Sequence, residues 1–276
     1  MISLLAAAAL LTDQPACAPI NGVDALLARP ERIIVLGEIH GTTETPEAFL
    51  AMICEAAKQG PVTVGLEMPE TDRPLLDMVM SAPDEATAAR YLRAGDFGDP
   101  RRDDGRHSLA MFDMILGLWR LKAAGLDVAL HPFAGRMSVI RGRDQAWWEL
   151  EMAYGMSRAL VDRPDARLMV LVGNLHARKT VYDRWSEVGL PAAGHLYPAD
   201  TLTLRTTQQG GQSWNCQEEC GAHDGMAIDD PDARGIILGP VEDGAYDGVL
   251  AVGPTTASPP AALQNQPAVT SSGSSS

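Results

Sequence analysis

Basic residues are scarce in this chain, which has 22 Lys and Arg against 36 Asp and Glu and a formal net charge of −14. Nucleic acids and anionic membrane surfaces are bound mainly through clustered Lys and Arg. We therefore expect neither as the main partner, whereas a neutral or cationic small ligand suits this charge. No apolar stretch is long enough to cross a bilayer, which predicts a soluble mature protein without a transmembrane segment.

Several catalytic motifs are also missing from the sequence. The strained elbow Gly-x-Ser-x-Gly, which presents a catalytic serine, does not occur. Neither of the glycine motifs that bind phosphates, GxxxxGK(S/T) and GxGxxG, follows an expected strand. Nucleotide hydrolysis and hydride transfer are therefore disfavoured, and a hydrolase that activates water fits better than one that uses a covalent serine.

Cysteine is scarce, with four residues in the chain: Cys17, Cys54, Cys216 and Cys220. An even number suits an oxidising compartment, although four cysteines in a chain of this length do not make a disulfide-rich scaffold. Cys216 and Cys220, with His223 beyond them, could be metal ligands. Their spacing is not one of the strong zinc patterns, so a local disulfide is the favoured interpretation.

Residues 1–11 (MISLLAAAALL) form an apolar run of the length found in signal peptides. Ala16 and Ala18 are small residues at the spacing that signal peptidase requires, so we expect residues 1–18 to be a signal peptide and the protein to be exported, to the periplasm or outside the cell. No Lys or Arg precedes the run and Pro19 would follow the cut, so a frayed N-terminal helix is the alternative. The residues before Cys17 make a poor lipobox, and no lipid anchor is predicted.

Short apolar runs alternate with helical patterns over residues 19–253, which predicts a single α/β domain with a mostly parallel sheet flanked by helices. The expected strands are 32–36, 62–66, 127–130 and 168–172, with weaker candidates at 194–197, 201–205, 236–238 and 248–252. The expected helices start near Pro46 and Ser108 and cover 144–161 and 177–188. Residues 69–107 are expected to be a helical cap insertion or an elaborated surface crossover. Residues 206–234 are expected to be a long loop or a small excursion, and residues 254–276 a disordered tail.

Acidic residues and histidines follow each strong strand. Glu38 and His40 follow the first, Glu67 the second, His131 the third and His176 the fourth. Because ligands of open parallel sheets bind outside the carboxyl ends of the strands, we expect these side chains at one rim. There they can act as general acid and base, or as ligands of a divalent transition metal.

Each of these residues also has a structural interpretation when it is taken alone. Glu38 or Glu67 could stabilise the N-terminus of the next helix. A lone histidine at a strand end is more often hydrogen-bonded within a loop, and for His131, which precedes Pro132, a structural role is at least as plausible. The matching positions of His40 and His176 after their strands favour a shared site.

The order of these motifs resembles the ChaN-like, TIKI/TraB and erythromycin-esterase-like superfamily. The similarity rests on two Gly-x-x-His boxes, 37–40 (GEIH) and 173–176 (GNLH), with Glu67 between them at a strand end in GLEMP. The segment from Arg143 to Ala146 also resembles the Arg-Asp helix entry of ChaN-like proteins. The first box continues with Gly41, as in the esterase-like form, whereas the short insertion and the Arg143 segment are closer to ChaN-like haem-binding uptake proteins.

The resemblance implies roles for the matching residues. His40 would be the base or a metal ligand, Glu38 and Glu67 would polarise it or share the metal, and His176 would be the acid or a second ligand. If a metal is bound (Mn, Fe, Co or Zn), its expected ligands are His40, His176 and Glu67.

Three further residues are candidates for substrate binding. Arg143 could stabilise a developing oxyanion or bind a substrate carboxylate, or it could form a salt bridge at the start of its helix. Arg106, on the expected cap, and His131 are the other two.

Two functions remain open from the sequence. The first is an exported hydrolase of a small ester or peptide-like substrate, in which histidine and glutamate activate water, with or without a metal. The second is a non-catalytic haem- or iron-binding protein of the cell envelope. The sequence constrains the fold more closely than it constrains the substrate.

Overall fold

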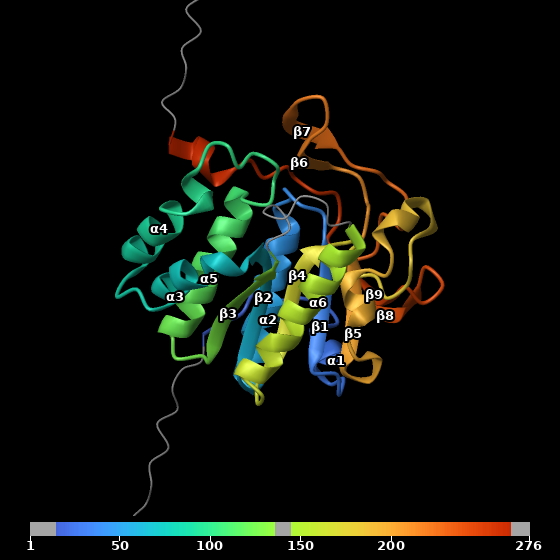
Figure 1. The fold of residues 1–276 in the computed structure, drawn as a ribbon, viewed down its shortest axis with the longest axis horizontal. Coiled ribbons are helices and arrows are strands. Elements are labelled where there is room, and N and C mark those ends of the chain that lie inside the picture. The colour runs from blue at the N-terminus through green and yellow to red at the C-terminus, as the bar shows by residue number, and fades with distance from the viewer. Residues whose placement is uncertain (1–14, 136–144, 266–276) are drawn as a thin grey trace, which may run out of the picture.

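Seven strands form one sheet in the order β3-β2-β4-β1-β5-β9-β8 (Figure 1). This computed structural model describes residues 15–135 and 145–265. All neighbouring strands are parallel except β8 and β9, which are antiparallel. The expected α/β class with a mostly parallel sheet is confirmed. The strands are β1 (Ile33–Glu38), β2 (Val62–Pro69), β3 (Val128–Ala134), β4 (Arg167–Gly173), β5 (Thr201–Thr206), β8 (Gly235–Val241) and β9 (Tyr246–Ala251).

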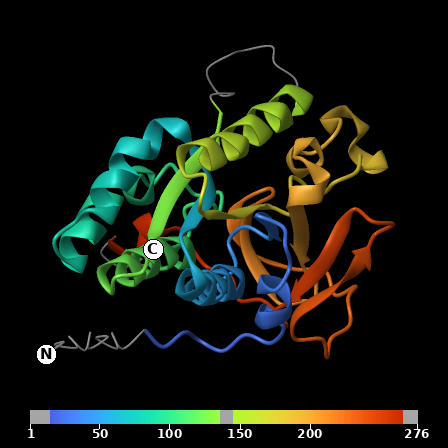
Figure 2. The same cartoon turned by 90° about the horizontal axis from the view of Figure 1, so that it is seen from below.

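Helices cover both faces of the sheet, as Figure 2 shows from the end of the strands. Alternate residues of β1 enter two separate cores, because successive side chains of a strand point to opposite faces. Ile34 packs into the core shared with α2 and α5, whereas Val35 packs into the core shared with α6. The α-helices are α1 (Val23–Leu27), α2 (Glu44–Gln59), α3 (Arg73–Met80), α4 (Glu85–Arg93), α5 (Leu109–Ala123) and α6 (Gln145–Asp162).

The helix starts follow from local chemistry. Ser108 precedes α5 with extended backbone, and its Oγ accepts a hydrogen bond from the Met111 N–H at 3.3 Å. Asp84 caps α4 in the same way, since its carboxylate accepts from the Thr87 N–H at 2.7 Å. These bonds satisfy N–H groups that lack a partner in the first turn of a helix.

The segment 69–107 lies beside the edge strand β3 and helix α5 (Figure 1). It contains α3, α4 and two short 3-10 turns, η1 (Glu70–Asp72) and η2 (Asp96–Gly98). The indole of Trp119, on α5, donates to the Ala82 carbonyl, and Arg120 forms an ion pair with Glu85. These contacts attach the segment to the helical layer, next to the carboxyl end of β2.

Two expectations about the second half of the chain are wrong. Residues 177–188 do not form an α-helix, and a 3-10 segment, η4 (Asp183–Val188), occupies their end, with Trp185 in a non-helical conformation. Residues 194–197 do not form a strand, because the 3-10 turn η5 (Ala192–His195) overlaps them and Pro191 and Gly194 interrupt extended pairing. Residues 206–234, expected to be a long loop or a small excursion, contain an antiparallel hairpin of β6 (Gln212–Cys216) and β7 (Cys220–Asp224).

The expected disordered tail is ordered as far as residue 265. Ser258 N–H donates to the Gly41 carbonyl at 2.8 Å, and Pro259 accepts from the Leu109 N–H at 2.8 Å. The described part of the tail includes a 3-10 turn, η7 (Ala261–Asn265), and η6 (Pro198–Asp200) precedes β5. Backbone hydrogen bonds to the turn after β1 and to the start of α5 therefore hold a segment whose composition suggested disorder.

Two disulfides are present. Cys216 and Cys220 are joined across the hairpin, which is the local disulfide that their spacing favoured. Cys17 is joined to Cys54 of α2, 37 residues away. A signal-peptide cut after Ala18 would remove Cys17, so this disulfide is incompatible with that cut. Within residues 15–135 and 145–265, no helix combines the length and hydrophobicity that crossing a bilayer requires.

Candidate active site at the carboxyl ends of the central strands

Three central strands deliver the site. Glu38 is the last residue of β1 and pairs in register with Gly173, the last residue of β4. Glu67 lies near the end of β2, which is the other neighbour of β4. A Cβ at Gly173 would lie 3.2 Å from His40 Nε2 and 3.7 Å from Glu67 Oε2. The glycine of the second box thus leaves room for the side chains around it.

The carboxylate of Glu67 lies between two imidazoles. Its Oε2 is 3.7 Å from His40 Nε2, and its Oε1 is 4.0 Å from His176 Nε2. Both distances exceed a hydrogen bond, while the Gly173 N–H donates to Oε2 at 2.9 Å and fixes the carboxylate. The Nε2 atoms of the two histidines therefore face one carboxylate without being bonded to it.

A second carboxylate holds each histidine through Nδ1. His40 Nδ1 lies 2.9 Å from Glu38 Oε1, and His176 Nδ1 lies 2.8 Å from both oxygens of Glu149. Glu149, on α6, is completely buried and also accepts the Ala192 N–H at 2.9 Å. An Nδ1–H bonded to a carboxylate leaves Nε2 of a neutral histidine free to accept a proton.

Sequence reasoning missed Glu149, which follows no strand. The signal that could have found it is its place on α6, where Met152, Ala153 and Met156 mark the buried face at helical spacing. An acidic residue three positions before that series lies on the same apolar face, where a carboxylate needs a partner.

The two central groups have shifted pKa values. Burial alone would lower the pKa of His40, but the charge and hydrogen bond of Glu38 and the charge of Glu67 outweigh it, so this pKa is raised. Burial alone would raise the pKa of Glu67, but the two histidines, Arg106 and the hydrogen bond from Gly173 lower it. The ionised carboxylate of Glu67 is suited to hold a water molecule, and the basic imidazole of His40 is suited to deprotonate it.

Glu67 and His176 open onto a cavity of about 1100 Å³. Its walls come from the insertion, from α6 and from η4, and they include two indoles, Trp148 and Trp185. Acidic groups outnumber arginines in the lining. The charged lining residues are Glu67, Asp72, Asp96, Asp104, Glu187, Arg102 and Arg106.

The three candidates for substrate binding have different outcomes. Arg106 lines the cavity, with Nε 3.5 Å from Glu67 Oε1 and Nη1 2.8 Å from Asp104 Oδ2. His131 is not brought to the cluster, because β3 continues past it and its ring is buried against Arg73 and the Gly155 carbonyl. Arg143 lies outside the described residues.

The predicted metal ligands do not fit a shared ion in this arrangement. Ligands of one zinc ion at about 2.0–2.2 Å lie within roughly 4.4 Å of one another. Among the described residues, one group of three His, Cys, Asp or Glu has all its donor atoms within 4.8 Å, and it consists of Asp103, Cys216 and Cys220. Both sulfurs of that group are joined in the disulfide. We therefore derive no catalytic step through a metal.

Haem would need an axial ligand in the cavity, where the described lining histidines are His107 and His176. Their Nε2 atoms lie 3.7 Å from Asp96 and 4.0 Å from Glu67, and neither distance is a hydrogen bond. The geometry is therefore compatible with an acid–base role and with an axial-ligand role for these histidines, and haem binding stays a prediction.

The structure of this chain is similar to those of several known proteins. No protein-family model matches the chain, and no curated protein matches its sequence. A mutant of erythromycin esterase EreC in its open conformation has a TM-score of 0.61 at 13% identity, over 84% of this chain and 92% of that chain. A Bacillus cereus protein has a TM-score of 0.61 at 12% identity, over 87% and 92% of the two chains. ChaN of Campylobacter jejuni, described with cofacial haem binding, has a TM-score of 0.44 at 11% identity, over 82% and 89%. The chain is thus similar in fold to erythromycin esterase and its structural relatives, as its two Gly-x-x-His boxes predicted.

Proposed function

We propose that this protein is a hydrolase of a small ester or peptide-like substrate. The observation that carries the proposal is the arrangement of two carboxylate–imidazole pairs, Glu38–His40 and Glu149–His176, around Glu67. Each imidazole presents Nε2 to the Glu67 carboxylate, and Glu67 and His176 line a cavity that can hold a substrate. The fold shared with an esterase supports this reading.

In this mechanism His40 is the general base. With Nδ1 bonded to Glu38, its Nε2 takes a proton from a water that Glu67 helps to hold, and the water attacks the substrate carbonyl. His176 acts in its protonated form: its Nδ1–H stays bonded to Glu149 while its Nε2–H is given to the leaving group. The proton that His40 takes from the water is returned to His176 through solvent before the next turnover. Arg106, beside Glu67, stabilises the negative charge that develops on the carbonyl oxygen.

The cavity favours a neutral or cationic substrate with apolar parts. Trp148 and Trp185 offer apolar surface, whereas the acidic lining disfavours anions. Two disulfides suit an oxidising compartment, which supports the proposal that the protein is exported.

The test is turnover of a panel of small esters and peptides by His40→Ala and by a control, His195→Ala. His195 is exposed and outside the cavity lining. General acid–base groups contribute about 10²- to 10⁴-fold, so we expect a loss of that size in His40→Ala and none in the control. Circular dichroism verifies that both variants are folded.

Full activity of His40→Ala across the panel would refute the mechanism. Absence of turnover by the unaltered protein, together with a Soret shift on haem titration, would favour the haem-binding alternative.

A further inference from the structure

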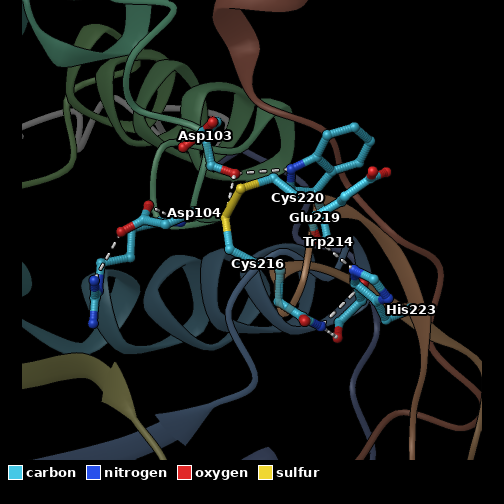
Figure 3. Close-up of a disulfide and its surroundings, with 10 residues drawn as sticks. Asp103, Asp104, Trp214, Cys216, Glu219, Cys220 and His223 are labelled. Atoms are coloured by element: carbon cyan, nitrogen blue, oxygen red, sulfur yellow. Dashed lines mark hydrogen bonds and ion pairs between the residues drawn. A yellow bond between two sulfur atoms is a disulfide. The ribbon is translucent and has the colours of Figure 1, made fainter.

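The hairpin 212–224 contacts the main chain on both sides of the site. Trp214 N–H donates to the Gly41 carbonyl at 2.8 Å, and Gly41 directly follows His40. The indole Nε1–H of Trp214 donates to the Asp103 carbonyl at 2.9 Å, three residues before Arg106 (Figure 3). One residue of the hairpin therefore joins the turn after the proposed base to the loop before the arginine beside Glu67.

Two glycines make this close approach possible. Gly41 and Gly105 have φ of +73° and +87°, a backbone region that residues other than glycine rarely adopt. A Cβ at Gly41 would lie 2.0 Å from the Trp214 carbonyl oxygen, and one at Gly105 would lie 2.3 Å from the same atom. Three main-chain segments thus meet at Trp214 with no space for a side chain on the other two.

The loop held in this way carries Arg106. Its guanidinium is bonded to Asp104 and lies 3.5 Å from Glu67, while 45% of the side chain is exposed to solvent. The ion pair with Asp104 is half-exposed on both sides and stabilises the position of Arg106 little. The pair with the buried Glu67 forms only where the loop backbone, which is fixed at Asp103 and Gly105, brings the guanidinium within reach.

The Cys216–Cys220 disulfide is next to this junction. The two cysteines face each other across the hairpin, and both are exposed. Cys216 Sγ also lies 3.6 Å from the Asp103 carbonyl oxygen, which accepts the Trp214 indole (Figure 3). A two-stranded hairpin alone is marginally stable, so a covalent link near Trp214 limits its fraying.

We propose that Trp214 is a positioning residue whose action depends on the Cys216–Cys220 disulfide. It holds the 103–105 loop against the turn after His40 and so keeps Arg106 beside Glu67. Reduction by a dithiol adds two electrons and two protons to the S–S bond, gives two thiols, and converts the dithiol to its own disulfide. The hairpin then frays, and Arg106 leaves its place.

The first test does not depend on the proposed hydrolase function. Amide hydrogen exchange is measured by mass spectrometry for peptides that contain Trp214, residues 41–43 and residues 103–107 in Cys216→Ser/Cys220→Ser, with Cys17→Ser/Cys54→Ser as the control for loss of a disulfide elsewhere. The Trp214 N–H is the donor to Gly41, and loss of one net hydrogen bond corresponds to about 5-fold faster exchange of that amide. We expect this change at Trp214, together with faster exchange of the two segments that it contacts, in the first variant alone. Unchanged exchange there, or the same change in both variants, would overturn the proposal.

The second test rests on the proposed function and separates positioning from a general structural role. Trp214→Phe keeps an aromatic ring and the main-chain N–H but removes the indole donor to Asp103. We expect it to lower kcat about 5-fold with little change in KM. In an Arg106→Gln background the same substitution should have no further effect, because coupled residues are not additive.

Equal effects of Trp214→Phe with and without Arg106 would show that the tryptophan does not act through the arginine. If no substrate is found, the exchange experiment still decides whether the hairpin holds the loop. Trp214→Phe is then compared with the unaltered protein in the same exchange assay.

Discussion

His176 Nδ1 lies 2.8 Å from both carboxylate oxygens of Glu149, a residue with no exposed surface. A buried carboxylate is costly unless hydrogen bonds satisfy it. Here Gln145 donates to Oε1 at 2.8 Å and the Ala192 N–H donates to Oε2 at 2.9 Å. The fully bonded carboxylate can therefore fix the orientation of His176 and keep its Nε2 toward Glu67.

Glu149→Gln should lower kcat by about 10²-fold, because a neutral amide no longer stabilises the protonated His176 that donates from Nε2. Stability should fall by about 1–3 kcal/mol, since the Ala192 N–H or the imidazole loses its acceptor. Steady-state kinetics and urea unfolding measure the two effects. Glu55→Gln is the control, because Glu55 forms a surface ion pair with Lys58. An unchanged kcat in a folded Glu149→Gln would exclude the orienting role.

Glu67→Gln should lower the pKa of His40. The carboxylate charge of Glu67 is one of the causes that raise this pKa above 6.5, and the neutral amide removes it. A two-dimensional NMR titration of the His40 ring follows the change without any substrate. A His40 pKa that stays the same or rises in Glu67→Gln would contradict the electrostatic description of the site.

The same shifts fix the dependence of stability on pH. The folded pKa of His40 is raised, so its contribution is fully present below pH 6.5 and is lost as pH rises through the folded value. The folded pKa of Glu67 is lowered, so its contribution is present above pH 4.5 and is lost as pH falls through the folded value. His40→Ala should therefore flatten the alkaline side of the curve of unfolding free energy against pH.

The convergence of Glu38, His40, Glu67 and His176 followed from the sequence because parallel strands end at the same edge of a sheet. The third strand misled this reasoning. The strand was expected to end at residue 130, yet its pairing with β2 continues to Ala134. Because β3 is an edge strand, Pro132 can leave its missing N–H on the unpaired side.

Other contacts depend on tertiary packing, which local patterns do not encode. The bond between Glu149 and His176 joins residues 27 positions apart, and Trp214 bonds to Asp103 over 111 positions. Residues 255–265 are ordered by contacts that include the turn at Gly41, although their composition is typical of disorder.

His131→Ala tests the placement of that residue outside the site. Its ring is 2% exposed and its Nε2 lies 2.9 Å from the Gly155 carbonyl oxygen, so its loss should cost about 1–3 kcal/mol of unfolding free energy. The kcat per folded molecule should remain within about twofold, because the hydrogen-bond partners of His131, Arg73 and the Gly155 carbonyl, are not among the proposed catalytic groups. A large loss of kcat without unfolding would return His131 to the site.

The disulfide between Cys17 and Cys54 leads to a prediction about both stability and processing. It closes a loop with a sequence separation of 37, for which the chain-entropy estimate is about 4 kcal/mol. Cys17→Ser/Cys54→Ser should therefore unfold at a lower urea concentration than the unaltered oxidised protein, by roughly that free energy. Cys216→Ser/Cys220→Ser is the comparison, and loss of that disulfide should cost less unfolding free energy, because it closes a shorter loop with a separation of 4.

If a leader is removed on export, the intact mass of the secreted protein should show that the cut precedes Cys17, because a cut after Ala18 would leave Cys54 without its partner. A secreted protein that begins at Pro19 with Cys54 as a free thiol would contradict this pairing.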